Sequence, residues 1–471
     1  MPRPKEGTAL NRFVTRFVAR RWVVLPLVLL AIACAILFAL RLLTMQPAAD
    51  AGTTAYEAAR TLFLQGKYDD ALAALSRVKA DFPSTAPDAQ RMIGCCYQWK
   101  GDYDRAVAEY RKLLTDYPAS EAAKQAHFWI GTCYESKSLD GEAISEFLEQ
   151  VKVAPEAKAA ETRHKLATRY RVLGNAQMAE QHFRELRGLT SAADAATAKR
   201  ANLLVGCYLR ESGKWADAAE HYTKIKGKYP EEAEDITFQL AESQFASQQY
   251  TAAAQTYRDF AERFHNSPQA KHARLRVEES LRDLGRYDDA LAYLKGLAEQ
   301  GGDLEPDALL RQAEILGGYQ NQSGAALDIC QLLTEKFPQD TRIMGLVEFT
   351  RGSLYLNRLH DPAKAREHFQ TMLTKYPDKN LSVQAACHIA SCYYAERDFA
   401  TARILFEKAA TDYECPVKAW RAYARWMAGD CLFRQQKAQQ AAAVWEEVAK
   451  EYPDTDWGKL AKDSLAGIPG R

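Results

Sequence analysis

The chain has 471 residues and a formal net charge of +1, with 26% charged and 47% hydrophobic residues. That length is too great for one compact domain unless the fold is an elongated repeat. The near-neutral balance provides no general attraction to nucleic acid, so no polynucleotide partner is expected. The charge is uneven, however, because residues 1–41 contain seven basic residues and one acidic residue. A basic N-terminal segment followed by a mildly acidic remainder of the chain indicates contact with a membrane.

An uncharged run of 19 residues, WVVLPLVLLAIACAILFAL, follows most of these basic residues, from Trp22 to Leu40. As a helix it would span about 28 Å, close to the ~30 Å hydrocarbon core of a bilayer. We therefore predict a basic cytoplasmic arm over residues 1–21, a transmembrane signal-anchor helix over 22–43 that contacts the lipid bilayer, and a linker over 44–52. The excess of arginine before the run predicts that the N-terminus stays inside and the body lies outside the cytoplasmic membrane.

Cleavage of this segment is the main alternative to anchoring. Ala49-Asp50-Ala51 resembles a cleavage site, and cutting there would release a soluble periplasmic protein. The site lies some ten residues beyond the apolar run, however, farther than is usual for a secretory signal. Cys34 lies in the middle of the run, whereas a lipoprotein signal would need it at the end. A cytosolic orientation of the body is a further alternative, because unpaired thiols are unusual in an oxidising compartment.

One alanine recurs along the rest of the chain at intervals of 35 to 39 residues. Four positions after it comes a large apolar or aromatic residue in nearly every repeat, such as Tyr110 or Phe147. Eleven positions after it an aromatic residue usually recurs, often followed by proline, as in Tyr117-Pro118. Three features with one period indicate stacked helical hairpins, each of which needs its neighbours to bury its apolar faces. The recurrent alanines, expected in the repeat core, are Ala71, Ala106, Ala143, Ala179, Ala218, Ala253, Ala290, Ala326, Ala365, Ala402 and Ala441.

The residues of one repeat show why the sequence predicts two helices joined by a turn. Apolar residues at helical spacing begin at Ala89 and predict a first helix. Gly101 ends that helix, and Asp102 can cap the second one. The small recurrent alanine lets the two helices approach closely, and the aromatic residue four positions later fills the space above it. Pro118 cannot continue the second helix and ends it.

The pattern G-x-x-Y, then G-D-Y-x-x-A-x-x-x-Y, then Y-P, which runs from Gly94 to Pro118, resembles the tetratricopeptide repeat. The resemblance covers about 400 residues in eleven units. It implies an all-α, right-handed solenoid over residues 53–454, closed by a capping helix and tail over 455–471. The stretch Tyr117–Tyr134 is similar to tetratricopeptide modules of bacterial cell-envelope proteins, such as the Tol–Pal coordinator, the barrel-assembly lipoprotein and the translocon accessory subunit. Repeats four, eight and nine match least well, so we expect local irregularity there.

The sequence predicts no enzyme, no cofactor and no metal site. It contains no C-x-x-C, H-E-x-x-H or G-x-S-x-G motif. Four cysteines lie ten residues before a recurrent alanine, where the family usually has a small buried residue, and are expected to pack as small hydrophobes. They are Cys96, Cys133, Cys392 and Cys431.

The remaining candidate site is a surface. In the stack that the resemblance implies, the first helix of each repeat lines a concave groove, and its outward positions are rich in aromatic residues and arginine, which are common where partners bind. The acidic residues Glu135, Glu211 and Glu279 argue against a purely basic groove. The groove candidates are Tyr56, Arg60, Phe63, Arg91, Trp99, Phe128, Arg171, Phe238, Phe245, Arg282, Arg311, Tyr319, Tyr394, Trp426, Phe433 and Arg434.

These features predict a membrane-anchored scaffold at the bacterial cell envelope, with its repeats in the periplasm, that binds protein or peptide segments. Two alternatives are the cleaved, soluble periplasmic adaptor and a structural spacer between membrane and cell wall that has no groove partner.

Overall fold

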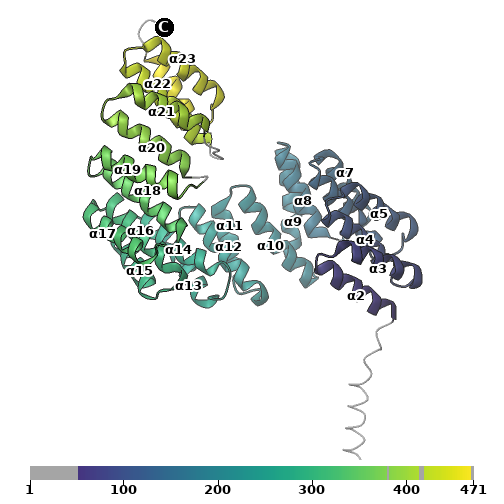
Figure 1. Ribbon diagram of the computed structural model, residues 1–471. Coiled ribbons are helices and arrows are strands. Elements are labelled where there is room, and N and C mark those ends of the chain that lie inside the picture. Colours follow the sequence, from purple (N-terminus) through teal and green to yellow (C-terminus); the bar gives the residue numbers. More distant parts are fainter. Residues whose placement is uncertain (1–50, 157, 379–380, 413–417, 468–471) are drawn as a thin grey trace, which may run out of the picture. The chain divides into compact units, whose positions relative to one another are not determined.

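The computed structural model of the chain describes residues 51–156, 158–378, 381–412 and 418–467. Every regular element within these ranges is a helix, and Figure 1 shows the α-helices following one another as antiparallel hairpins. The helices that lead each repeat are α2 (Ala51–Leu64), α4 (Ala86–Trp99), α6 (Ala126–Ser136), α8 (Ala159–Val172), α10 (Ala195–Glu211), α12 (Ala233–Ala246), α14 (Ala270–Asp283), α16 (Glu305–Gly318), α18 (Thr341–Asn357), α20 (Ser382–Ala395) and α22 (Lys418–Arg434). We call these the first helices.

The second helices carry the recurrent alanine. They are α3 (Tyr68–Asp81), α5 (Tyr103–Asp116), α7 (Asp140–Val153), α9 (Ala176–Gly188), α11 (Trp215–Ile225), α13 (Tyr250–Arg263), α15 (Tyr287–Glu299), α17 (Ser323–Lys336), α19 (Pro362–Lys375), α21 (Phe399–Asp412) and α23 (Ala438–Glu451). Helix α24 (Asp456–Ala466) follows as the predicted capping helix. Short 3₁₀-helices are η1 (Ala123–Gln125), η2 (Leu189–Ser191), η3 (Pro230–Glu232) and η4 (Gly302–Leu304).

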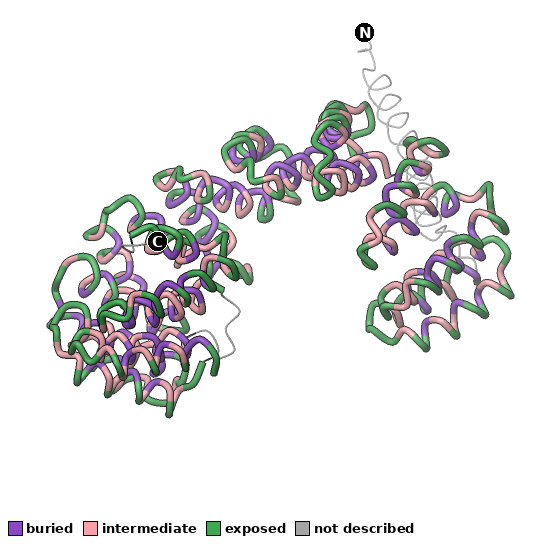
Figure 2. The backbone as a smooth tube through the Cα atoms, turned by 90° about the horizontal axis from the view of Figure 1, so that it is seen from above, coloured by how far each residue is buried: buried purple, intermediate pink, exposed green. Residues whose placement is uncertain are grey.

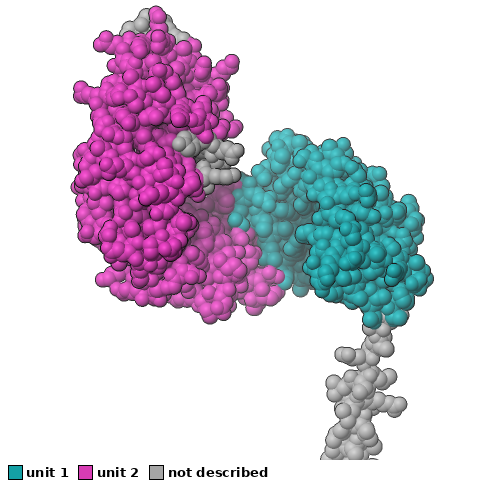
Figure 3. Space-filling model, viewed as in Figure 1, with its two compact units in different colours: residues 1–212 teal, residues 213–471 magenta. Residues whose placement is uncertain are grey.

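The chain divides into two compact units, residues 1–212 and 213–471, which Figure 3 colours separately. In unit 1, four hairpins from α2–α3 to α8–α9 are followed by α10, which packs against α8, α9 and η2. In unit 2, α11 packs on α12, six hairpins follow from α12–α13 to α22–α23, and α24 packs against α22 and α23. The all-α hairpin architecture is therefore confirmed, and a single right-handed solenoid over residues 53–454 stays a prediction.

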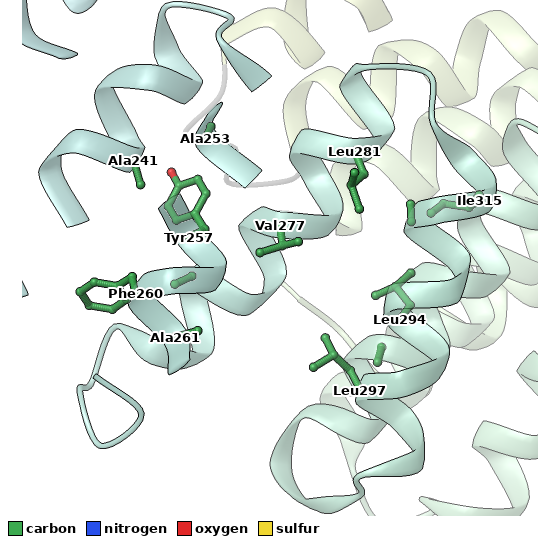
Figure 4. Packing of buried hydrophobic residues seen from close by; sticks show 13 residues of the cluster. Ala241, Ala253, Tyr257, Phe260, Ala261, Val277, Leu281, Leu294, Leu297 and Ile315 are labelled. Carbon is green, nitrogen blue, oxygen red and sulfur yellow. The ribbon is translucent and has the colours of Figure 1, made fainter. Parts of the chain in front are cut away.

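The recurrent alanines form the contact between paired helices, and each of the eleven is at most 3% exposed. The large residue four positions later is also buried, and Tyr110, Phe147 and Tyr257 are 0% exposed. Burial of such a side chain contributes about 1.5–3 kcal/mol. Figure 4 shows Tyr257 and Leu294 pointing into the core of α12–α16, and Figure 2 shows buried residues alternating with exposed ones along the hairpins. One apolar stripe per helix thus builds a core that continues from each hairpin to the next.

Every turn between a first and a second helix contains one residue in the left-handed region, with φ between +53° and +79°. Each lies five residues before a recurrent alanine, so the turn has the same period as the core. Glycine fits this conformation without cost, whereas other residues lose about 1–2 kcal/mol. The eleven residues are Gly66, Gly101, Ser138, Gly174, Gly213, Gln248, Gly285, Asn321, His360, Arg397 and Gln436. The sequence identifies this turn readily only where glycine occupies it.

The recurrent cysteines pack in the core, as predicted. Cys96, Cys133, Cys392 and Cys431 are 0% exposed, and none of the described cysteines forms a disulfide. Burial raises the pKa of the Cys96 thiol to about 12. A thiol of this kind stays protonated near neutral pH and is a poor nucleophile. The neighbouring Cys95 is half-buried and accepts a hydrogen bond from a tyrosine hydroxyl of α5 at 3.3 Å.

His388 on α20 lies in an aromatic cluster of unit 2. Its ring stacks on Phe369 at 5.1 Å between centroids and meets Phe349 and Trp420 edge-on at 5.5 and 6.1 Å. Burial lowers the pKa of His388 from 6.5 to about 4. The unfolded chain therefore takes up a proton at higher pH than the folded chain does. The stability that neutral His388 contributes is present above pH 6.5 and is lost as the pH falls toward 4.

We expect His388→Phe to remove this acid sensitivity, because phenylalanine keeps the aromatic packing and cannot be protonated. Between pH 7.5 and pH 5 the variant should gain about 1–2 kcal/mol over the wild type in the local opening free energy of α20. Hydrogen exchange of α20 amides, compared between the two proteins at each pH, measures the difference. His265→Phe, at an exposed position, is the control. If the difference in α20 opening free energy between His388→Phe and wild type stayed the same from pH 7.5 to pH 5, the acid sensitivity would not come from His388.

Candidate binding face

Polar contacts join first helices of neighbouring repeats within each unit. In unit 1, Arg91 on α4 donates to the hydroxyl of Tyr56 on α2 at 2.8 Å. In unit 2, Arg311 on α16 pairs with Glu278 on α14 at 2.6 Å. Such contacts place the outward side chains of successive first helices side by side, and we call this surface of each unit the first-helix face. Figure 1 shows α14, α16 and α18 on the inner side of the curve that unit 2 follows.

At the start of unit 1, the first-helix face presents aromatic rings. Trp99, at the end of α4, is 69% exposed. Its ring meets Phe63 of α2 edge-on, with centroids 6.3 Å apart. Arg91 lies over the ring of Trp129 at 5.6 Å, so its guanidinium is already engaged. Arg60 forms an ion pair with a glutamate of its own helix at 3.1 Å. Trp99 is therefore the predicted residue of this region that is most available to a partner.

Four predicted residues are half-buried and take part in packing. Phe128 lies 5.9 Å from the core aromatic ring of its own hairpin, and Phe238 lies 5.2 Å from a buried ring of α13. The ring of Phe245 lies 4.4 Å below the guanidinium of Arg276. Nε of Arg171 is buried and has no hydrogen-bond acceptor among the described residues. These positions stiffen the stack and expose less surface than the sequence suggests.

The predicted residues Arg282 and Arg311 belong to a charge network between α14 and α16. Arg311 pairs with Glu278 at 2.6 Å and with Glu279 at 3.0 Å, and Arg282 lies 3.6 Å from Glu278. The Glu278 side chain is 0% exposed, and this burial raises the pKa of its carboxyl above the ordinary value despite both arginines. Arg276 also pairs with Glu279, at 2.8 Å. The two predicted arginines are thus largely neutralised within the protein.

The last repeats hold the remaining C-terminal candidates. Tyr394 donates to the carboxylate of Asp430 at 2.5 Å, and Arg434 lies 3.4 Å from the same carboxylate. The indole of Trp426 donates to a serine hydroxyl of α24 at 3.3 Å. Phe433 is 41% exposed. Tyr394 and Trp426 are therefore committed to contacts between neighbouring helices, and Arg434 pairs with a carboxylate of its own helix. Phe433 is the one of the four that presents the most apolar surface.

The structure brings some predicted residues together and separates others. Phe63 joins Trp99, and Arg282 joins Arg311, whereas Tyr319 is 54% exposed and stacks on Tyr287 of α15 at 4.8 Å. Sequence reasoning missed Glu278, which lies twelve residues before a recurrent alanine. A count of charged residues at that register on the first helices would have found it. The assignment of all these residues to a binding groove stays a prediction.

The predicted arm over residues 1–21 and transmembrane segment over 22–43 lie outside the described residues, as does most of the linker. Of the helices that are described, none is both long and apolar enough to span a membrane. Within the same part of the chain, no group of three or more histidine, cysteine, aspartate or glutamate residues is arranged to hold a metal ion.

Comparison with known families identifies the repeat. One tetratricopeptide repeat model matches residues 54–85, 88–120, 236–267 and 423–455, and a second matches 279–341. The matches confirm the repeat that the recurrent alanine predicts. Repeats of this fold are generally non-catalytic scaffolds. No curated protein matches the chain.

Solved structures that are similar to the chain include yeast Tom70, at 14% identity over 88% of this chain and 96% of that chain, with a TM-score of 0.33. Human IFIT1 is 13% identical over 78% of this chain and 84% of that chain, with a TM-score of 0.39. A tetratricopeptide repeat protein from Parabacteroides merdae is 13% identical over 59% of this chain and 98% of that chain, with a TM-score of 0.35. Scores this low carry no argument about function.

Proposed function

We propose that this chain, which carries tetratricopeptide repeats, is a membrane-anchored scaffold that binds polypeptide segments on its first-helix face. The observation that carries the proposal is Trp99, which is 69% exposed and lies beside Phe63 on that face. A large exposed aromatic ring is costly to leave in water and is typical of the residues that dominate binding energy. We propose no catalytic role.

The packing of the first helices supports binding without large rearrangement. Contacts such as Arg91 to Tyr56 and Arg311 to Glu278 hold neighbouring first helices in place before a partner arrives. A preformed face reduces the conformational entropy that binding must overcome. An extended or helical segment laid along the face would contact several repeats at once.

The sequence of the N-terminal region supports the anchor and the location. The uncharged run from Trp22 to Leu40 is long enough to cross a bilayer, and the basic residues before it favour a cytoplasmic N-terminus. The scaffold would then hold its repeats on the outer side of the cytoplasmic membrane, in a bacterial cell envelope. There it would gather protein partners near the membrane surface.

The test compares Trp99→Ala with Ile404→Ala in full-length protein purified from native membranes. Ile404 is 55% exposed on the second helix α21, so it matches Trp99 in exposure but lies off the first-helix face. We expect Trp99→Ala to lower the yield of at least one co-purified protein about tenfold or more, a loss typical of a binding hot spot. Quantitative mass spectrometry measures the yield. If wild type and both variants co-purified with the same proteins in the same amounts, binding of partners on the first-helix face would be contradicted.

The same preparation tests the anchor. Protein that keeps residues 22–40 and stays in the membrane after alkaline washing supports it. A mature N-terminus near Gly52 would show that the segment is cleaved and the scaffold released.

A further inference from the structure

We infer that helices α8, α9 and α10 form an acid-sensitive segment at the end of unit 1, in which protonation of two buried histidines, His164 and His182, loosens the packing of the three helices. The inference goes beyond the proposed function and does not depend on it. Because α8 and α10 are first helices, acid would loosen the last part of the first-helix face of unit 1.

Polar atoms without partners concentrate in this segment. Eight buried side-chain nitrogen or oxygen atoms between Thr162 and Ser212 have no hydrogen-bond partner, more than in all other described parts of the chain together. Two of the eight are the Nε2 atoms of His164 and His182. Buried polar groups are normally paired, so this concentration marks a segment of low local stability.

His182 on α9 lies between an aromatic ring and a carboxylate. The residue is 4% exposed, and its ring stacks on that of Tyr170 of α8 with centroids 5.6 Å apart. Its Nδ1 lies 3.1 Å from a carboxylate oxygen of Glu185, to which the neutral ring can donate, so that Nε2 carries no hydrogen. Protonation would place a hydrogen on Nε2 at a buried point where no described residue offers an acceptor.

His164 on α8 faces α10. Its side chain is 12% exposed, and its ring meets that of Tyr208 edge-on with centroids 6.4 Å apart. A carboxylate oxygen of Glu211 lies 3.7 Å from Nε2, too far for a hydrogen bond, and accepts one from Thr168 at 3.2 Å. The Glu211 side chain is itself exposed to solvent, so water screens its attraction for a charged His164.

The other carboxylates around the two histidines are already engaged by basic residues. The ion pairs are Arg163 with Glu185 at 2.6 Å, Lys165 with Glu135 of α6 at 2.6 Å, Arg169 with Asp140 of α7 at 3.0 Å, and Arg200 of α10 with Glu161 at 3.3 Å. A proton added to either imidazole would therefore enter a region where positive charge is abundant and the negative charge is already shared.

The histidines change charge in a pH range that a cell environment can reach. Burial lowers the pKa of both His164 and His182 below the ordinary value of 6.5. Lys165 and Arg200 act in the same direction on His164, as Arg163 does on His182, and the carboxylates offset this only in part. The unfolded segment therefore binds protons at higher pH than the folded segment does. The stability that the neutral rings contribute is present above pH 6.5 and is lost as the pH falls below that value.

Substitutions that cannot be protonated test the inference. The double variant His164→Phe, His182→Phe keeps both aromatic contacts, and the double variant His164→Gln, His182→Gln keeps hydrogen-bonding capacity at both positions. His265→Phe changes an exposed histidine of unit 2 and is the control. Helices α2 to α5 contain no histidine and serve as the reference within the same unit.

The readout is hydrogen exchange of the full-length protein in detergent between pH 7.5 and pH 5, with each rate divided by the intrinsic rate at that pH. In the wild type we expect the opening of α8 and α9, relative to that of α4 and α5, to increase about tenfold over this range. In both double variants the same ratio should change less than about twofold, and in His265→Phe it should follow the wild type. Because each protein is compared with itself, a constant loss of stability in a variant cancels.

The inference is overturned if acid opens α4 and α5 as much as α8 and α9, if it opens neither, or if both double variants keep the wild-type response to pH. If neither double variant folds, the wild-type profile decides, because opening confined to α8–α10 supports the inference and uniform opening overturns it. None of these outcomes bears on the co-purification test with Trp99→Ala, so the proposed function stands or fails separately.

Discussion

Arg311→Met is expected to lower the local opening free energy of α14–α16 by about 3 kcal/mol, because it leaves a buried carboxylate without its main partner. Glu278 is 0% exposed, and Arg311 approaches it at 2.6 Å. Arg282, at 3.6 Å, is too distant to replace the lost hydrogen bonds. Methionine fills much of the arginine volume, so the change mainly removes charge. Hydrogen exchange of α14 and α16 amides in the full-length protein measures the loss.

The pH dependence of this loss separates charge from packing. Without Arg311, Glu278 should take up a proton more readily, so the difference from wild type should shrink as the pH is lowered from 7.5 to 5. Adding Glu278→Leu to Arg311→Met should restore most of the stability, because an apolar pair needs no compensation. Arg60→Met is the control, since Arg60 pairs with Glu57 on an exposed surface and should cost less than about 0.5 kcal/mol. An equal effect of Arg311→Met and Arg60→Met would contradict the argument.

The repeat core could be predicted from the sequence because its residues recur at fixed spacings within each hairpin. Ala106 and Tyr110 are separated by one helical turn, and both are 0% exposed. Their burial follows from spacing and residue size alone. The turn shows where this reasoning weakens. Gly101 marks the left-handed position, whereas Gln248 and Arg397 adopt the same conformation with no local signal, because the surrounding repeat fixes it.

The binding face could be predicted only in part, because its side chains depend on contacts between repeats. Sequence spacing marks Trp99 and Phe245 as equally outward, yet Trp99 is 69% exposed and Phe245 packs under Arg276. Whether such a side chain stays exposed or becomes packed depends on the residue that the neighbouring first helix presents, some 30 positions away in the sequence. The carboxylate partners of Arg311 arise in the same way. Periodicity identifies the face, and the stacking of neighbouring repeats decides which residues remain available.

Phe147→Ala is expected to lower the local opening free energy of α6–α7 by about 3–5 kcal/mol, the usual cost of deleting a buried aromatic ring. Phe147 is 0% exposed and fills the space between the two helices of its hairpin. Because each repeat contacts mainly its neighbours, the loss should fade over one or two hairpins. Hydrogen exchange of α6 and α7, with α2 and α3 as the distant reference, measures both the size and the range of the effect.

The effect of a second change at Gly131 should reverse sign in this background. A Cβ on Gly131 would lie 2.7 Å from the ring of Phe147, so Gly131→Ala alone should cost about 1–3 kcal/mol through overpacking. Once the ring is gone, the same methyl group enters the cavity and alanine favours the helix by about 1 kcal/mol, so the change should be neutral or stabilising. Gly141→Ala, where a Cβ meets nothing within 4 Å, should behave alike in both backgrounds. If Gly131→Ala destabilised both proteins equally, the ring of Phe147 would not be what requires glycine there.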